Sequence, residues 1–322
     1  MRAAVITELG QPPQPADFPE PTAGEGRALV RVTAAPLNPV EVRVSSGHFP
    51  RQPKPPYVPG SEGVGTVIQN GRLPAGTRVR FETPLPGFGA NGGLAEVAAV
   101  YSDSLVELPD AAGDALAAAI GTVCITAWMA LDRARLSAGE TVLVLGATGA
   151  VGQAAVQLAK LRGAGRVVAA GRDADALART AELGADATVN LAAEDNLTGA
   201  FRDAAGGDLD VVVDPLWGAP AVAAMKVIAE GGRVVALGQS AGAEAAPPID
   251  VLRNKQAAIE FLSTGWMPLD SKRDAYRKVL AHALAGDLAV DLEVVPFDDV
   301  ATAWERQAKS PGRKLVISID QP

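Results

Sequence analysis

The sequence contains very few residues that bind metal ions or form disulfides. It has one cysteine, Cys124, and two histidines, His48 and His282, among 322 residues. A single cysteine excludes an intrachain disulfide and indicates a reducing compartment. A structural zinc site takes four Cys or His ligands, and neither histidine lies at a metal-ligand spacing. We therefore expect no bound metal and a cytoplasmic protein, with Cys124 as a packed thiol.

Long apolar runs and positive charge are also missing. No stretch of about eighteen apolar residues is present to cross a bilayer, and the first residues, MRAAVITELG, lack the apolar core of a signal peptide. The 29 Lys and Arg are outnumbered by 37 Asp and Glu, which gives a net charge of −8. Nucleic acids and anionic membranes both attract proteins through Lys and Arg. We expect neither of them as a partner.

The chain length favours two domains rather than one core. Residues 1–110 are rich in Pro and Gly and contain short β-type runs, a pattern typical of a barrel or sandwich. The predicted strands there are 3–6, 28–33, 63–68, 77–81 and 94–100. One helix is predicted at 39–46, because Pro39 suits a first helical turn and Asn38 is a good N-cap.

Beyond residue 110 the pattern changes to alternating helix and strand. A helical stretch broken near Gly121 comes first, and βαβ units follow, which predict a parallel sheet. The predicted strands are 141–146, 166–171, 187–190, 208–214, 231–238 and 258–264; the predicted helices are 150–161, 174–183 and 219–229; helices at 271–284 and 298–308 and a strand at 314–319 end the chain. The fold expected is α/β, with a Rossmann-type domain at 123–263 inserted in a β-rich domain formed by 1–122 and 264–322.

Two glycine clusters are candidates for phosphate binding. The first, YVPGSEGVGTV at 57–67, leads into a strand, so no helix dipole points at it; we expect its glycines to permit a bulge and close packing. The second, GATGAVG at 146–152, lies between a strand and a helix, as in dinucleotide-binding turns. The alternative is a tight connection without a ligand. The candidate cofactor ligands of this turn are Gly146, Thr148, Gly149, Ala150, Val151 and Gly152.

The end of the next strand selects the cofactor. In NAD-binding proteins an acidic residue there accepts hydrogen bonds from the ribose 2′-hydroxyl. Here the strand ends at Gly171 and Arg172 follows, and a guanidinium matches a 2′-phosphate. We therefore predict NADPH. Asp173 is the counter-argument, since a shift of two residues would bring its carboxylate to the 2′-hydroxyl.

Several motifs in the same order resemble one family. They are PLNPVEVRVSSGHF (36–49), PYVPGSEGVGTV (56–67), GGLAEV (92–97), TAWMAL (126–131), GATGAVG (146–152), VVVDPLWG (211–218) and GRKLVISI (312–319). Over its whole length the chain resembles the zinc-independent quinone oxidoreductase branch of the medium-chain dehydrogenase/reductase superfamily. The resemblance implies a GroES-like β domain split by the Rossmann domain, with the cofactor between them. It also implies a homodimer, with edge pairing through the strand at 258–264.

The resemblance extends to site residues. Zinc-dependent relatives carry Cys where Asn38 stands and His where Ser61 stands. Thr126 resembles the family's threonine beside the nicotinamide. Further candidate cofactor contacts are Leu237, Gly238, Gln239, Leu262, Ser263 and Arg313. Arg313 faces either the cofactor phosphates or solvent, and Asp214 either shapes the ribose or adenine side or caps a turn.

Without zinc to stabilise an alkoxide, the easier chemistry is hydride delivery to an acceptor that is already polarised. We expect reduction of a small-molecule electrophile, a quinone or α,β-unsaturated carbonyl, by NADPH. Asn38 is a candidate donor to the substrate or only a helix cap, and Tyr57 is a candidate acid or only a packed ring; water is the default proton source. The alternatives are an enoyl-thioester reductase of the same superfamily and a nucleotide-binding protein with little turnover.

Overall fold

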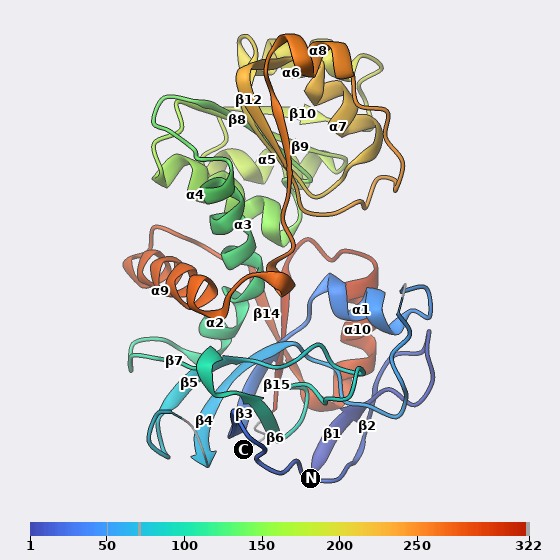
Figure 1. The fold of residues 1–322 in the computed structure, drawn as a ribbon, viewed down its shortest axis with the longest axis vertical. Coiled ribbons are helices and arrows are strands. Elements are labelled where there is room, and N and C mark those ends of the chain that lie inside the picture. Colours follow the sequence, from blue (N-terminus) through green and yellow to red (C-terminus); the bar gives the residue numbers. More distant parts are fainter. Residues whose placement is uncertain (50, 70–71, 320–322) are drawn as a thin grey trace. The chain divides into compact units, whose positions relative to one another are not determined.

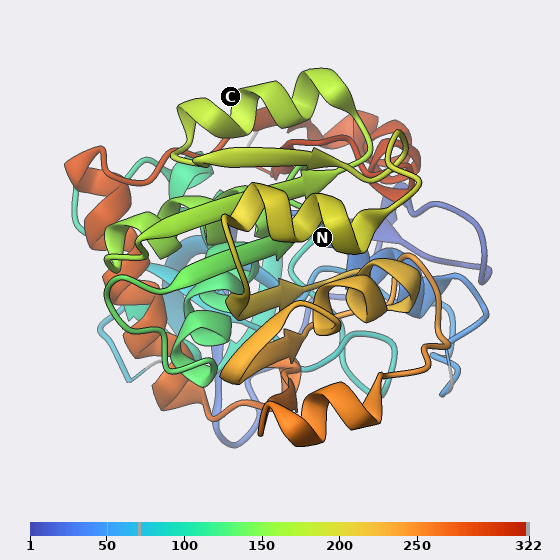
Figure 2. The ribbon, with the colours of Figure 1, turned by 90° about the horizontal axis from the view of Figure 1, so that it is seen from above.

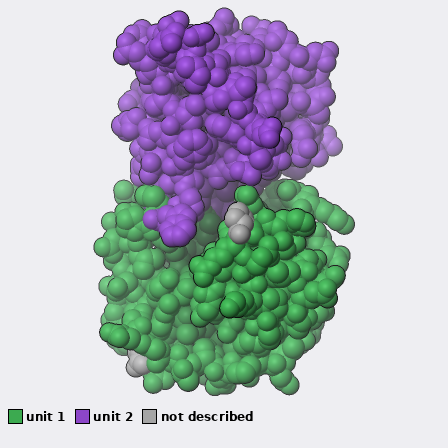
Figure 3. Space-filling view, turned by 45° about the vertical axis from the view of Figure 1, so that its right-hand side comes forward, with its two compact units in different colours: residues 1–122, 267–284, 290–322 green, residues 123–266, 285–289 purple. Residues whose placement is uncertain are grey.

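The chain forms two compact units, which are coloured separately in Figure 3. A computed structural model describes residues 1–49, 51–69 and 72–319. Unit 1 comprises Met1–Thr122, Met267–Leu284 and Val290–Pro322, and unit 2 comprises Val123–Trp266 and Ala285–Ala289. No helix in the described ranges is both long and apolar enough to cross a membrane.

Unit 1 is built on a mostly antiparallel sheet (Figure 1). The strands run in the order β14-β15-β3-β4-β5-β7, with β6 also paired to β3, and β1 and β2 form a separate pair. The bounds are β1 Arg2–Val5, β2 Gln14–Asp17, β3 Arg27–Pro36, β4 Glu62–Gln69, β5 Arg78–Glu82, β6 Val97–Tyr101, β7 Val106–Glu107, β14 Leu292–Pro296 and β15 Lys314–Ser318. The helices are α1 Pro39–Ser45, α2 Asp114–Ala119, α9 Leu269–Ala285 and α10 Val300–Ala308, with short 3-10 turns η1 Ser102–Ser104 and η3 Phe297–Asp299.

The first glycine cluster lets β4 lie close to its neighbours. A Cβ atom on Gly65 would stand 2.0 Å from the carbonyl oxygen of Arg31 on β3, and one on Gly63 would stand 2.6 Å from the Phe81 ring on β5. The register of β3 against β4 also shifts beside Gly65. The prediction that this cluster serves packing and a bulge is confirmed.

Unit 2 contains a six-stranded parallel sheet with helices packed against it (Figure 2). The strands run in the order β10-β9-β8-β11-β12-β13. Their bounds are β8 Thr141–Leu145, β9 Arg166–Gly171, β10 Ala187–Asn190, β11 Leu209–Asp214, β12 Ile228–Ala236 and β13 Ala258–Phe261. The helices are α3 Thr122–Arg133, which begins at the edge of unit 1, α4 Ala150–Leu161, α5 Ala174–Glu182, α6 Leu197–Ala205, α7 Gly218–Met225 and α8 Ile249–Asn254, with the 3-10 turn η2 Thr264–Trp266.

The chain starts this sheet at β8, adds β9 and β10 on one side of it, and then returns to add β11, β12 and β13 on the other side. The boundary between β8 and β11 is therefore the topological switch point of the sheet. In open parallel sheets a ligand binds beyond the carboxyl ends of the strands at such a switch point, and this order is that of dinucleotide-binding domains. Strands β8, β9 and β11 are largely apolar and buried. Helices α6 and α7, yellow to gold in Figure 2, pack against each other, and Phe201 and Ala221 belong to the core that they help to form. The fold class predicted from the sequence is confirmed.

Some elements were absent from the prediction or differ from it. Helix α6, LTGAFRDAA, was absent from the prediction, and the Asn196 side chain caps it by accepting a hydrogen bond from the backbone N–H of Gly199 at 3.0 Å. The predicted helix 219–229 ends at Met225, because Ile228 already belongs to β12. Short strands such as β2 and β7 have too few residues to show a periodic pattern.

Candidate functional site

The turn between β8 and α4 has the geometry of a phosphate cradle. Gly146 adopts φ +62°, and a Cβ atom on Gly152 would stand 2.3 Å from the Gly146 carbonyl oxygen, so both positions need glycine. At Gly149 the nearest atom to such a Cβ lies 3.5 Å away, which leaves its outer side open. Gly149 is also the N-cap of α4 and provides no side-chain cap, so the first N–H groups of this helix remain available to an anion. This turn fits a dinucleotide pyrophosphate.

The end of β9 carries a free cation and no free acid. A Cβ atom on Gly171 would lie 2.8 Å from the Thr148 side chain, so this glycine lets the glycine turn approach β9. Arg172 is exposed and makes no ion pair with the described residues. Asp173 instead caps α5, where its Oδ1 accepts a hydrogen bond from the Ala176 N–H at 2.8 Å. The carboxylate that argued against NADPH is therefore already engaged.

Asp214 ends β11 with one carboxylate oxygen satisfied and one orphaned. Its Oδ1 accepts hydrogen bonds from the backbone N–H groups of Leu216 and Trp217, both at 2.8 Å. Its Oδ2 is buried and has no partner in the described structure. Burial raises the pKa of this carboxyl above its usual value. Asp214 thus caps the turn, as the structural alternative for this residue expected.

The remaining candidates of unit 2 cluster around the ends of β12 and β13. The Leu237 N–H donates to the Asp214 carbonyl at 2.7 Å, and the Leu262 N–H donates to the Ala236 carbonyl at 3.0 Å. Gly238, Gln239 and Ser263 are exposed beyond these strand ends. The Thr126 hydroxyl on α3 donates to the hydroxyl of Thr264 at 3.4 Å, which brings it beside the residues that follow β13.

Asn38 in unit 1 lies in a buried polar cluster. It is 1% exposed. Its Nδ2 donates to Glu62 Oε1 at 3.0 Å and to Glu41 Oε1 at 3.3 Å, and its Oδ1 accepts from Lys314 Nζ at 2.5 Å. Both ends of the amide are therefore engaged inside the protein, an arrangement that favours the structural alternative for Asn38 over a donor to substrate.

Glu41 joins this cluster from the first turn of α1. Its Oε2 accepts a hydrogen bond from the Asn38 backbone N–H at 3.1 Å, and its Oε1 accepts from the Ser61 N–H at 2.9 Å and the Ser61 hydroxyl at 2.7 Å. Burial raises the pKa of Glu41, although the hydrogen bonds from Ser61 and Asn38 and the charge of Lys314 oppose that rise.

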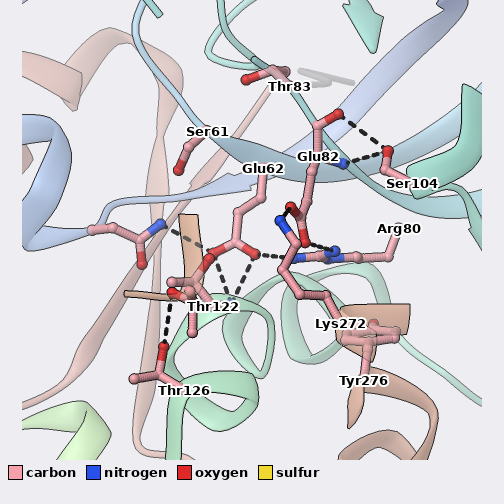
Figure 4. Close-up of polar contacts among 12 residues, drawn as sticks. Ser61, Glu62, Arg80, Glu82, Thr83, Ser104, Thr122, Thr126, Lys272 and Tyr276 are labelled. Carbon is pink, nitrogen blue, oxygen red and sulfur yellow. Dashed lines mark hydrogen bonds and ion pairs between the residues drawn. The ribbon is translucent and has the colours of Figure 1, made fainter. Parts of the chain in front are cut away.

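The cluster continues through a buried guanidinium (Figure 4). Arg80 donates from Nη2 to Glu62 Oε2 and from Nη1 to Glu82 Oε1, each at 2.7 Å. Lys272 pairs with the other oxygen of Glu82. Burial favours the neutral form of Glu82, but the charges of Arg80 and Lys272 outweigh it and lower its pKa. We call Asn38, Glu41, Ser61, Glu62, Arg80, Glu82, Lys272 and Lys314 the buried charge network.

Tyr57 and Arg313 also belong to unit 1. The Tyr57 ring is 3% exposed, and its hydroxyl has no hydrogen-bond partner among the described residues. Burial, followed by the charge of Glu41, raises the pKa of Tyr57 to about 12, so the phenol stays protonated. Arg313 pairs with Asp291 at 2.9 Å and with Glu293 at 3.4 Å, so its guanidinium already faces two carboxylates.

The donors at the positions of the two zinc ligands do not fit zinc. Zinc binds thiolate, imidazole or carboxylate, whereas Asn38 and Ser61 offer an amide and a hydroxyl, both hydrogen-bonded to glutamates. Lys314 brings an ammonium group against Asn38 and would repel a second cation. Among residues 1–49, 51–69 and 72–319, no group of three His, Cys, Asp or Glu side chains is placed to hold a metal.

Comparisons with known proteins agree with this fold. Residues 24–110 match the alcohol dehydrogenase GroES-like domain family, and residues 150–283 match the zinc-binding dehydrogenase family. A quinone oxidoreductase of Lama guanicoe is 30% identical and covers 99% of this chain and 98% of its own. The crystal structure of the quinone oxidoreductase of Thermus thermophilus, also studied with NADPH, has 31% identity and a TM-score of 0.80 and covers 99% of this chain and 100% of its own.

A third relative is a phenolphthiocerol/phthiocerol polyketide synthase of Mycobacterium tuberculosis, 33% identical over 99% of this chain; this chain spans 15% of that protein. Fold, glycine turn and comparisons define an oxidoreductase of the medium-chain dehydrogenase/reductase superfamily, with an NAD(P)-binding Rossmann-type domain. Within that superfamily, the chain belongs to the quinone oxidoreductase branch.

Sequence reasoning missed most of the buried charge network. Arg80, Lys272 and Lys314 are at most 7% exposed. Arg80 and Lys314 do leave one signal in the sequence, because each is a charged residue in a short β-type run, RVRFE for Arg80 and KLVIS for Lys314. A charge at such a position needs a buried partner, although the pattern does not identify which one.

Proposed function

We propose that this protein transfers a hydride from NADPH to a quinone or an α,β-unsaturated carbonyl without a metal ion. The observation that carries the proposal is the buried charge network. At the positions where zinc-dependent relatives bind metal, Asn38 and Ser61 are hydrogen-bonded to Glu41, and Lys314 supplies an internal cation. Oxidation of an alcohol needs a Lewis acid to stabilise the alkoxide left when the hydroxyl proton leaves. Reduction of an acceptor that is already polarised has no such step.

When bound, the nicotinamide supplies the hydride. In an unsaturated carbonyl this hydride reduces the β-carbon, the carbon–carbon double bond becomes an enolate, and a proton then completes the saturated product. The residues of unit 2 would hold the cofactor, with its pyrophosphate at the turn formed by Gly146–Gly152. Water supplies the proton, with the Tyr57 phenol as the candidate alternative.

The preference for NADPH is supported by charge at the end of β9. Arg172 makes no ion pair with the described residues, and the nearby Asp173 carboxylate caps α5. A 2′-phosphate would pair with this guanidinium, whereas a 2′-hydroxyl would gain little from it.

The test is steady-state oxidation of NADPH and NADH with a neutral quinone, an α,β-unsaturated ketone and a simple aldehyde. The proposal predicts turnover of the first two acceptors with NADPH and very slow turnover of the aldehyde. Tight NADPH binding without turnover of any acceptor would favour a nucleotide-binding protein instead. If water supplies the proton, turnover by a Tyr57→Phe variant should stay within about twofold of wild type. A general acid contributes about 100-fold or more, so a loss of that size would identify Tyr57 as the proton donor.

A further inference from the structure

The segment formed by the end of α1 and the loop after it has a charge opposite to that of the protein. The chain carries a net charge of −8, yet residues 42–61 contain no Asp or Glu. The same stretch carries Arg43, His48, Arg51 and Lys54. All four side chains are exposed, and none makes an ion pair with any residue that the structure describes. An acidic protein thus presents unneutralised cations on one segment, at the end of α1 and in the loop after it.

Aromatic rings lie among these cations. The rings of Phe49 and Phe88 are 6.2 Å apart, and the guanidinium carbon of Arg51 lies 5.0 Å from the centre of the Phe88 ring. Phe88 comes from a second segment, 83–95, that also contains no Asp or Glu. We call Arg43, His48, Phe49, Arg51, Lys54 and Phe88 the basic patch.

Hydrogen bonds hold the basic patch in shape. The Lys54 backbone N–H donates to the Gly87 carbonyl at 2.9 Å, which fixes the two segments together. Gly87 adopts φ +84°, and a Cβ atom there would stand 2.5 Å from Pro53 Cβ, so this contact requires glycine. The Ser46 hydroxyl donates to the Arg43 carbonyl at 2.8 Å and accepts from the His48 N–H at 3.1 Å, which ties the end of α1 to the loop.

We infer that the basic patch binds the phosphates and adenine of an acyl-coenzyme A, so that the unsaturated carbonyl reduced by this protein is an enoyl thioester. The inference rests on the proposed hydride transfer and narrows its acceptor. Exposed Arg and Lys side chains without carboxylate partners are suited to phosphates. Phenylalanine rings beside a guanidinium are suited to stacking on a nucleobase.

Coenzyme A matches the patch better than a simple quinone does. A quinone is flat and neutral, and it would leave the three permanent cations of the patch unused. Coenzyme A carries a diphosphate, a 3′-phosphate and an adenine, which together can engage several cations and both rings. Its long pantetheine arm separates these groups from the thioester, so the basic patch need not touch the reacting carbons.

The first test compares binding of free coenzyme A by calorimetry with wild type, Arg51→Gln, Lys54→Gln and Phe88→Ala. Each of the three substitutions should raise the Kd of coenzyme A about tenfold, which is the effect of losing one charge-assisted hydrogen bond or one stacked base. Lys309→Gln is the matched control, because Lys309 is another exposed cation of unit 1 without an ion pair among the described residues. NADPH binding should stay at the wild-type value in all four variants. Equal weakening of NADPH and coenzyme A, or no weakening of either, would overturn the inference.

The second test separates this inference from the proposed function. The protein is offered the same crotonyl group on coenzyme A and on pantetheine, which lacks the phosphates and the adenine. The inference predicts a KM at least tenfold lower for crotonyl-coenzyme A, a difference that disappears in Arg51→Gln/Lys54→Gln at unchanged kcat. Equal KM values for the two thioesters would refute it while leaving hydride transfer intact. Weakened coenzyme A binding in the variants without turnover of any acceptor would refute the hydride-transfer function instead.

Discussion

Both carboxylate oxygens of Glu62 accept hydrogen bonds from the backbone N–H of Thr122, at 3.0 and 2.8 Å, although the two residues are 60 positions apart. Thr122 is the first residue of α3, so the carboxylate lies at the positive end of the helix that carries Thr126. This contact gives Glu62 in the first glycine cluster its role: it holds the start of α3 while Arg80 and Asn38 fix its other sides.

Gly121 should be required for this contact. A Cβ atom at this position would stand 2.1 Å from Glu62 Oε2, and Glu62 cannot move aside without breaking its hydrogen bonds to Arg80 and Asn38. We expect Gly121→Ala to lower the free energy of unfolding by about 1–3 kcal/mol, as overpacking does. The measurement is urea unfolding. Gly24→Ala is the control, because a Cβ there meets nothing nearer than 4.0 Å; equal effects of the two changes would contradict the contact.

Arg80→Met should be strongly destabilising at neutral pH. The change leaves Glu62 and Glu82 buried without their shared guanidinium, and breaking a buried ion pair costs about 3–5 kcal/mol. Arg202→Met, which breaks an exposed pair with Asp208, should cost about 1 kcal/mol or less.

The effect of Arg80→Met should also depend on pH. Because Glu82 has a lowered pKa in the folded protein, the stability that its carboxylate contributes is present above its ordinary pKa and is lost as the pH falls through the lowered pKa. The loss of unfolding free energy in Arg80→Met, relative to wild type, should therefore become smaller as the pH falls. A loss that becomes larger in acid would argue against the buried charge network.

Asp214→Asn should become more stable relative to wild type as the pH rises. Burial raises the pKa of the Asp214 carboxyl. The stability that the protonated Asp214 carboxyl contributes is therefore fully present below its ordinary pKa of about 3.9 and is lost as the pH rises through the raised pKa. Asparagine does not titrate and keeps an oxygen for the Leu216 and Trp217 N–H groups. Thermal unfolding from pH 3 to 7 without cofactor measures the difference, with exposed Asp195→Asn as the control; a difference independent of pH would contradict the buried, orphaned oxygen.

Arg172→Ala should remove the preference for NADPH. Loss of a charge-assisted contact with the 2′-phosphate corresponds to about a tenfold to hundredfold rise in the Kd of NADPH. The Kd of NADH should change by less than about twofold. Nicotinamide fluorescence titrations measure both values, and Arg253→Ala, another exposed arginine, is the control. Equal losses for NADPH and NADH would show that Arg172 does not bind the 2′-phosphate.

Local patterns in the sequence were sufficient for much of unit 2. The predicted helix 150–161 and strand 166–171 coincide with α4 and β9, because a buried parallel strand is a continuous apolar run bounded by turns. The glycine turn was visible for the same reason, since its spacing, strand and helix are adjacent in the chain. Bounds were less accurate where an apolar run continues from helix into strand, as at Ile228.

The buried charge network could not be derived in the same way. Lys314 and Asn38 are 276 positions apart, and only the pairing of β15 with β3 brings them together. Glu62 and Glu82 become neighbours through the register of β4 against β5. A sequence shows which residues carry charge, but the partner of a buried charge depends on long-range strand pairing. The interpretation of Asn38 as a donor to substrate depended on that missing information.

The most direct test of the account is to follow the hydride itself. NADPH carrying deuterium at the transferable position is mixed with an α,β-unsaturated acceptor and protein stripped of metal by a chelator, and the product is analysed by mass spectrometry. The account predicts one deuterium at the β-carbon at a rate unchanged by added zinc. Deuterium transfer that occurs only after zinc is restored, or that goes to a carbonyl carbon instead, would contradict metal-free hydride delivery.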